Sequence, residues 1–148
     1  MAVEEIKTAS AVMSLARKLE EEGAGFYSAL SQKFPEQSEA FAALAKENKR
    51  FISQLETTYY SVISDALEGC FSFRLEPAAY NLKVALKPGE GLPGAVKTAL
   101  AMEEKTMEFY NLAAEQSKGL LADVPRMMAQ ISQKREKRRT TLKDLISG

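Results

Sequence analysis

The stretch "LEEEGAGFYSAL", residues 19–30, returns in related form as "MEEKTMEFYNLA", residues 102–113. Both copies have two adjacent acidic residues followed at the same distance by Phe and Tyr, so Glu20 matches Glu103 and Tyr27 matches Tyr110. Internal similarity of this kind indicates a duplicated structural unit.

A second pair of related segments follows the first in each half of the chain. The segment "LAKENKRFISQL", residues 44–55, pairs with "ISQKREKRRTTL", residues 131–142, and both keep apolar residues at their two ends. Each half therefore contains the same two segments in the same order, as two copies of a helical hairpin would.

Apolar residues recur at steps of three and four in four segments, which is the rhythm of a helix with one buried face. The four segments are residues 6–34, 41–62, 96–113 and 131–145. Pro35 ends the first helix, and Pro125 is expected in the first turn of the fourth. Residues 65–93 lose the rhythm and are predicted to be a connection. We therefore predict an all-α fold, a ferritin-like four-helix bundle of two hairpins joined by a long crossover.

Composition limits the protein class. A chain of 148 residues with 45% hydrophobic composition is expected to form one domain, residues 1–148. Twenty basic and twenty acidic residues cancel, so no overall field favours nucleic acid or an anionic membrane. No stretch reaches the roughly 18 apolar residues of a membrane span. The single Cys70 excludes an internal disulfide, and no signal peptide is recognised, so a cytoplasmic protein is expected.

Each predicted helix carries a polar residue where its apolar stripe would favour leucine. These residues are Glu20, Asn48, Glu103, and Arg135 with Arg138. They lie at comparable depth, so we expect one internal polar site, which Tyr27 and Tyr110 could join by hydrogen bonds to the glutamates. A buried glutamate loses the hydration of its charge, so it either takes up a proton or finds a cation.

The sequence resembles rubrerythrin-type domains of the ferritin-like superfamily from about Val12 to Leu145, apart from most of the crossover. The shared features are a glutamate seven residues before a tyrosine in the first and third helices, and the segment "LAKENKRFISQLETTY" in the second. The resemblance implies a di-iron bundle that acts on peroxide or oxygen, commonly as a dimer. It also implies iron ligands of one glutamate from each of two helices and Glu-x-x-His from each of the others.

The chain departs from this pattern at the expected ligand positions. Asn48 and Phe51 stand where the second helix should have glutamate and histidine, and Arg135 and Arg138 do so in the fourth. The chain contains no histidine. Arginine stays protonated and repels metal. We therefore predict that the two arginines replace the irons as the cationic partners of the buried glutamates, and we expect no cofactor.

An alternative register remains open. Glu47 with Arg50, and Glu136 with Arg139, read Glu-x-x-Arg one residue away from the expected ligand positions. Rotation of both helices would gather four carboxylates around a metal such as manganese, magnesium or iron. The four are Glu20, Glu47, Glu103 and Glu136. The rotation would also expose seam residues such as Phe51, at about 1.5 to 3 kcal/mol for each apolar side chain, so the apolar pattern favours the first register.

Two functions follow from these readings. The first is a non-catalytic bundle that associates with itself or with a protein partner, which the sequence does not identify. The second is a metal-binding oxidoreductase for peroxide or oxygen with a carboxylate-only site. We expect a homodimer because of the resemblance and because the crossover is unusually apolar for an exposed loop. The apolar crossover residues are Phe71, Phe73, Leu75, Tyr80 and Leu82.

The basic run "QKREKRR", residues 133–139, does not predict a nucleic-acid site. Lys134, Lys137 and Arg139 fall outside the apolar stripe and are expected on a solvated face. The chain is neutral overall and carries no recognised nucleic-acid-binding motif. Neither nucleic acid nor membrane is therefore an expected partner.

Overall fold

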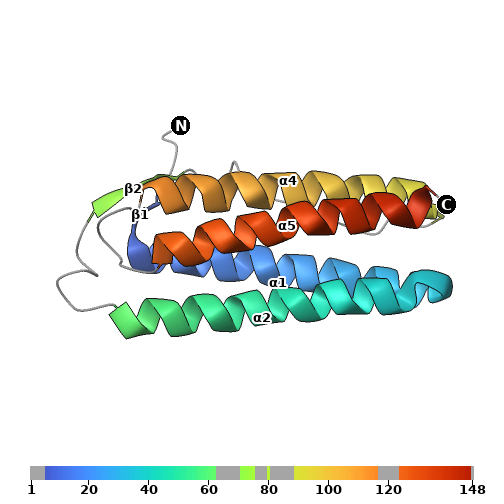
Figure 1. Cartoon of the computed structure of the whole chain (residues 1–148), viewed down its shortest axis with the longest axis horizontal. Coiled ribbons are helices and arrows are strands. Elements are labelled where there is room, and N and C mark those ends of the chain that lie inside the picture. Colours follow the sequence, from blue (N-terminus) through green and yellow to red (C-terminus); the bar gives the residue numbers. More distant parts are fainter. Residues whose placement is uncertain (1–5, 63–70, 76–79, 81–88, 117–123, 148) are drawn as a thin grey trace.

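Four long helices form most of the described chain in the computed structural model (Figure 1). The structure describes residues 6–62, 71–75, 80, 89–116 and 124–147. The helices are α1 (Ala9–Lys33), α2 (Ser38–Val62), α4 (Leu92–Gln116) and α5 (Val124–Ile146). Among the described residues, none of these helices has both the length and the apolar character needed to cross a membrane.

The turn between α1 and α2 follows from Pro35. Proline has no backbone N–H to donate, so α1 ends at Lys33 and a short 3-10 helix, η1 (Pro35–Gln37), leads into α2. The backbone N–H of Gln37 donates to the carbonyl of Phe34 at 3.0 Å. The Ser31 hydroxyl donates to the Ser38 carbonyl at 3.0 Å, which ties the end of one helix to the start of the next.

The helices pair as two hairpins, α1 with α2 and α4 with α5. Contacts between α2 and α5 and between α1 and α4 bring the hairpins together. In Figure 1, α1 and α5 run in one direction while α2 and α4 run in the other, so every pair of neighbouring helices is antiparallel. The end of α2 and the start of α4 lie at opposite ends of the bundle. The predicted all-α bundle of four helices is confirmed at this level.

Two short strands differ from the prediction. β2 (Phe71–Leu75) lies inside the predicted connection and pairs antiparallel with β1 (Ile6–Thr8), with Ile6 opposite Leu75. The apolar rhythm predicts a helix from Ile6, and this is wrong for Ile6–Thr8, because three residues are too few to show the two-residue period of a strand. The fourth helix begins at Val124 with Pro125 in its first turn, as predicted. Cys70 and Leu82 lie outside the described residues.

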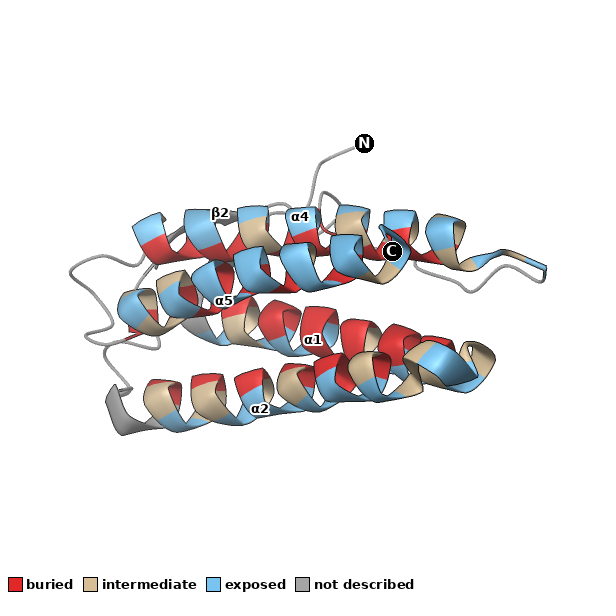
Figure 2. Cartoon of the chain, turned by 45° about the vertical axis from the view of Figure 1, so that its right-hand side comes forward, coloured by how far each residue is buried: buried red, intermediate tan, exposed pale blue. Residues whose placement is uncertain are grey.

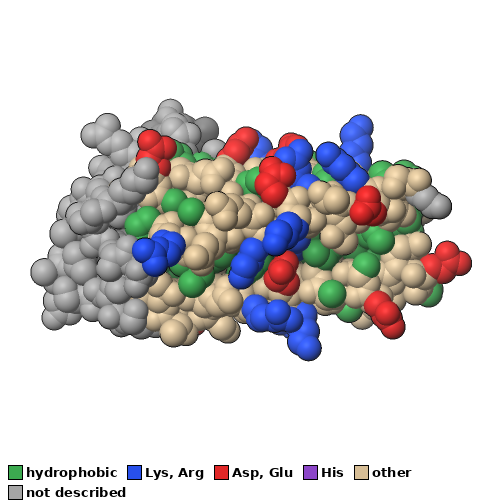
Figure 3. Space-filling model, viewed as in Figure 1, with side chains coloured by type: hydrophobic (Ala, Val, Ile, Leu, Met, Phe, Trp, Pro, Cys, Tyr) green, Lys and Arg blue, Asp and Glu red, His purple; other side chains and the backbone are tan. Residues whose placement is uncertain are grey.

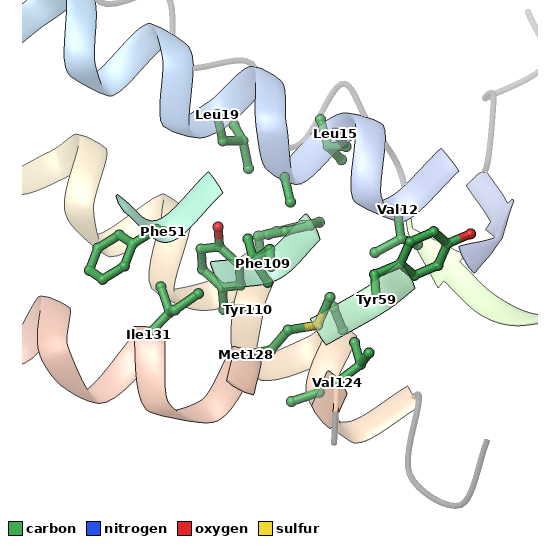
Figure 4. Packing of buried hydrophobic residues seen from close by; sticks show 14 of the residues in the cluster. Val12, Leu15, Leu19, Phe51, Tyr59, Phe109, Tyr110, Val124, Met128 and Ile131 are labelled. Carbon is green, nitrogen blue, oxygen red and sulfur yellow. The ribbon is translucent and has the colours of Figure 1, made fainter. Parts of the chain in front are cut away.

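The core consists of two apolar clusters separated by a polar layer. Buried residues line the inward faces of all four helices (Figure 2). The first apolar cluster includes Val12, Phe51, Phe109, Met128 and Ile131 (Figure 4). The second includes Phe26, Leu30, Phe41, Val96 and Leu142. Along every helix, the buried polar residues fall between the members of these two clusters.

Candidate functional site

The polar layer receives a side chain from every helix. α1 provides Glu20, α2 provides Asn48, α4 provides Glu103, and α5 provides Arg135 and Arg138; each is at most 3% exposed. Because the apolar stripes of the four helices face one another, a polar residue on each stripe must meet its counterparts at the same level. The structure thus brings together the five polar residues that the stripes predicted.

Arg135 bridges the two glutamates. Its Nη1 donates to Oε1 of Glu103 at 2.5 Å, and its Nη2 donates to Oε1 of Glu20. The fork of the guanidinium suits this arrangement, because its two terminal nitrogens can each donate to a different carboxylate. A single fixed positive charge therefore lies between two negative ones in the centre of the bundle.

Arg138 closes the network and connects it with the surface. Its Nη2 lies 2.6 Å from Oδ1 of Asn48 and 3.1 Å from Oε2 of Glu103. The Asn48 amide in turn donates to Oε1 of Glu20 at 2.8 Å, which completes a ring of contacts. The Nη1 of Arg138 reaches Glu47, whose side chain is 33% exposed, at 3.3 Å.

The two tyrosines bind the glutamates of the opposite hairpins. The Tyr27 hydroxyl donates to Oε2 of Glu103, and the Tyr110 hydroxyl donates to Oε2 of Glu20, both at 2.5 Å. Every carboxylate oxygen of the two glutamates therefore accepts at least one side-chain hydrogen bond. These hydrogen bonds offset the free-energy cost of removing the carboxylates from water.

The electrostatic environment fixes the charge states of the layer. Burial alone would raise the pKa of Glu103, but the charges of Arg135 and Arg138 and the Tyr27 hydrogen bond hold it below its ordinary value. Burial lowers the pKa of the Arg135 guanidinium, but the carboxylates of Glu20 and Glu103 together outweigh this effect and raise the pKa above its ordinary value. Burial and the neighbouring carboxylates raise the pKa of both tyrosines well above 10.0. At neutral pH the tyrosines are therefore neutral donors.

The two guanidinium groups lie over the faces of aromatic rings. The Cζ of Arg135 lies 5.4 Å from the centre of the Phe51 ring, and the Cζ of Arg138 lies 5.2 Å from that of Tyr27. Cation–π attraction is favourable at these distances, particularly away from water. Phe51 occupies the position of an expected histidine, so its ring contacts cations where the resemblance implies a metal ligand. The sequence pattern does not predict this role for Phe51.

Gly23 also contributes to the polar layer, a role that the stripe pattern does not predict. A Cβ at this position would lie 2.6 Å from Nδ2 of Asn48, closer than packed atoms approach. The glycine therefore leaves the space in which the Asn48 amide reaches Glu20. A glycine in the middle of a helical stripe is the signal that could have shown it, since such a residue usually has a packing reason.

The alternative register is not the one adopted. Phe51, Leu55, Ile131 and Leu142 are all buried on the seams. Glu47 is partly exposed beside Arg138, and Glu136 is exposed and lies 3.1 Å from Arg139. Among the described residues, no three acidic or cysteine side chains gather in a way that could hold a metal ion. The four-carboxylate cage is therefore not formed, because the apolar residues hold both helices in the other rotation.

The layer is a set of mutually neutralising groups. A metal ion between Glu20 and Glu103 would have to displace Arg135, which carries its own positive charge at any pH the fold tolerates. The carboxylate oxygens are already engaged by donors. Searches with the chain found no matching family model, curated protein or solved structure. The geometry of the layer is therefore the basis for assigning a function.

Proposed function

We propose that this chain is a rubrerythrin-like bundle in which an arginine has taken the place of the di-iron centre, and that it acts as a non-catalytic association or binding protein. The observation that carries this proposal is the Arg135 guanidinium between the carboxylates of Glu20 and Glu103. A protein that keeps two buried glutamates and fills the space between them with a fixed cation has no room there for metal chemistry.

The arrangement of the helices supports the ferritin-like part of the proposal. The two hairpins lie side by side, and α2, the second helix of the first hairpin, runs in the same direction as α4, the first helix of the second. A long connection between parallel helices is typical of ferritin-like bundles. The crossed contacts of Tyr27 and Tyr110 relate the two hairpins by an approximate twofold arrangement, as a duplicated unit would produce.

Metal analysis tests the central claim. We expect protein purified from cells supplied with iron and manganese to contain far less than one metal ion per chain, measured by mass spectrometry of the elements. A stoichiometric metal content would contradict the proposal and favour the carboxylate-only oxidoreductase.

A matched control restores the ligand set that the resemblance implies. The control carries Asn48→Glu, Phe51→His, Arg135→Glu and Arg138→His together, and we expect it to bind iron. Circular dichroism establishes that the control is folded. A folded control that takes up no metal would count against the ferritin-like arrangement of these positions.

Self-association is the other part of the proposal. A dimer is proposed from the resemblance, with an unidentified protein partner as a further possibility for the same role. Tyr80 does not contribute an exposed surface, because it is buried with its ring centre 5.4 Å from that of Phe109. Light scattering should give twice the chain mass; a monomer at high micromolar concentration would contradict the dimer.

A further inference from the structure

A groove runs along the surface between α2 and α5. Its cavity volume is about 420 Å³, within the range of roughly 300 to 1,000 Å³ that is usual for small-ligand sites. Ala40, Ala43, Leu44 and Glu47 line it on α2, and Lys134, Lys137, Arg138 and Thr141 line it on α5. One side is therefore mainly apolar with small side chains, and the other is basic.

The groove has a positive charge that the chain as a whole lacks. Among the residues that the structure describes, three cationic side chains and one acid, Glu47, line the groove, whereas the chain has no net charge. Lys134 and Lys137 are exposed, and neither forms an ion pair within the described part of the chain. Figure 3 shows Lys and Arg side chains near the middle of the face formed by α5 and α2, beside apolar side chains. Such a surface is complementary to an anion with an apolar body.

We propose that this groove binds a small monoanionic amphiphile, a carboxylate attached to a short apolar chain. The carboxylate would lie between the ammonium groups of Lys134 and Lys137 and the guanidinium of Arg138. The apolar chain would lie on Ala40, Ala43 and Leu44, whose small or branched side chains allow close approach. The inference rests on the proposed binding role and names the class of ligand.

The length of the groove favours a small ligand over a helix of a partner protein. The lining residues cover about two helical turns on each side, or roughly 10 Å. A docked amphipathic helix presents anchors at i, i+3, i+4 and i+7 and is itself about 10 to 12 Å wide. A two-turn groove therefore matches a short chain with one charged end better than it matches a helix.

Glu47 makes the charge argument testable in both directions. It lies 3.3 Å from Nη1 of Arg138, near the limit of a hydrogen bond, and its side chain is 33% exposed. A ligand carboxylate would compete with Glu47 for this nitrogen. Removal of the Glu47 charge should therefore tighten ligand binding, whereas removal of the lysine charges should weaken it.

The experiment uses octanoate as the ligand, titrated into the ¹⁵N-labelled full chain and followed by NMR. We expect saturable shifts at the amides of the lining residues, with n-octanol and octylammonium binding about tenfold more weakly because they lack the negative charge. Equal binding of octylammonium, or an absence of saturable shifts in the groove, would overturn the proposal. Neither result would bear on the metal content of the polar layer, so the two proposals fail separately.

Variants locate the binding. Lys134→Gln with Lys137→Gln should weaken octanoate about tenfold, and Glu47→Gln should tighten it about threefold. Lys18→Gln with Lys105→Gln removes the same charge from exposed positions on α1 and α4 and should change nothing. If the control pair weakens binding as much as the groove pair does, the charge effect is general and the groove is not the site.

Steric blocking completes the test. Ala43→Glu places an acid on the apolar side of the groove at an exposed position that tolerates it, and should abolish octanoate binding without changing the mass found by light scattering. A change in mass with this variant, together with no octanoate binding to the unaltered chain, would show that the groove contacts another protein chain and would overturn the proposal.

Discussion

The two hairpins of the bundle contribute the same glutamate and tyrosine but differ in what their second helices provide. α1 carries Glu20 and Tyr27, and α4 carries Glu103 and Tyr110 in the same relative positions. On α2 the matching positions hold Asn48 and Phe51, which are uncharged. On α5 they hold Arg135 and Arg138. Among the described residues that are fully buried, the first hairpin therefore brings one negative charge, and the second brings one negative and two positive charges.

This difference makes the hairpins electrostatically complementary. Neither can bury its share of the layer alone, because each would leave an uncompensated charge in low dielectric. When the hairpins dock, the buried charges cancel and the carboxylates acquire their donors. The difference in buried charge between the two similar hairpins thus favours their pairing in this one arrangement. Polar core residues select the arrangement of other helical assemblies in the same way.

Removal of Arg135 should have the largest effect. Arg135→Ala leaves both glutamates without their shared cation, so we expect a loss of about 3 to 5 kcal/mol in the free energy of unfolding. Arg138→Ala should cost less, since Arg135 still contacts Glu103 and since one partner of Arg138 is the partly exposed Glu47. Denaturation by urea measures both.

Two controls accompany the arginine variants. Lys134→Ala and Lys137→Ala change exposed neighbours and should stay within about 0.5 kcal/mol. Addition of Glu20→Gln and Glu103→Gln to Arg135→Ala should recover part of the loss, because the stranded charges are gone. Equal, mild effects at all four basic positions would contradict the importance of the layer.

Acid should weaken the junction between the hairpins. The pKa of Glu103 is lower in the folded chain than its ordinary value of 4.5, so its contribution to stability is present above about pH 4.5 and is lost as the pH falls through the folded pKa. Urea denaturation at steps from pH 7 to pH 3 should show this decline. Glu104→Gln, a change on the exposed face beside Arg139, should leave this decline in stability at low pH unaltered.

The two tyrosines should contribute unequally to stability, because Arg138 also contacts the Glu103 oxygen that Tyr27 binds. Tyr27→Phe and Tyr110→Phe each remove one hydroxyl that donates to a buried carboxylate, at an expected cost of about 1.5 to 3 kcal/mol. When Tyr27 is changed, Oε2 of Glu103 keeps the Arg138 guanidinium at 3.1 Å. When Tyr110 is changed, Oε2 of Glu20 loses its donor from the described residues, so Tyr110→Phe should cost more. Equal costs at the two tyrosines in urea denaturation would show that Arg138 does not support Glu103 when the Tyr27 hydroxyl is absent.

Apolar periodicity predicts much of this fold, because apolar residues at steps of three and four indicate both a helix and the face that it buries. Glu20, Asn48, Glu103 and the two arginines could be placed in one layer on that ground alone. The crossed pairing of the tyrosines could not, because it depends on how far the hairpins slide along each other. The β1–β2 pairing could not be predicted either, since its two segments lie far apart in the chain and are too short to show a clear period.

The smallest test concerns two glycines on α1 that differ only in what surrounds them. A Cβ on Gly25 meets nothing within 4 Å. Gly25→Ala, at an exposed position of α1, should therefore stabilise the helix by up to about 1 kcal/mol through helix propensity. Gly23→Ala gains the same propensity but places its Cβ 2.6 Å from Nδ2 of Asn48, an overlap that costs about 1 to 3 kcal/mol. Its net effect should therefore be a destabilisation of about 1 kcal/mol. Thermal and urea unfolding of both variants decides the point: if both alanines stabilise the fold, Asn48 can move aside, and its contact with Glu20 is not what requires a glycine in the first hairpin.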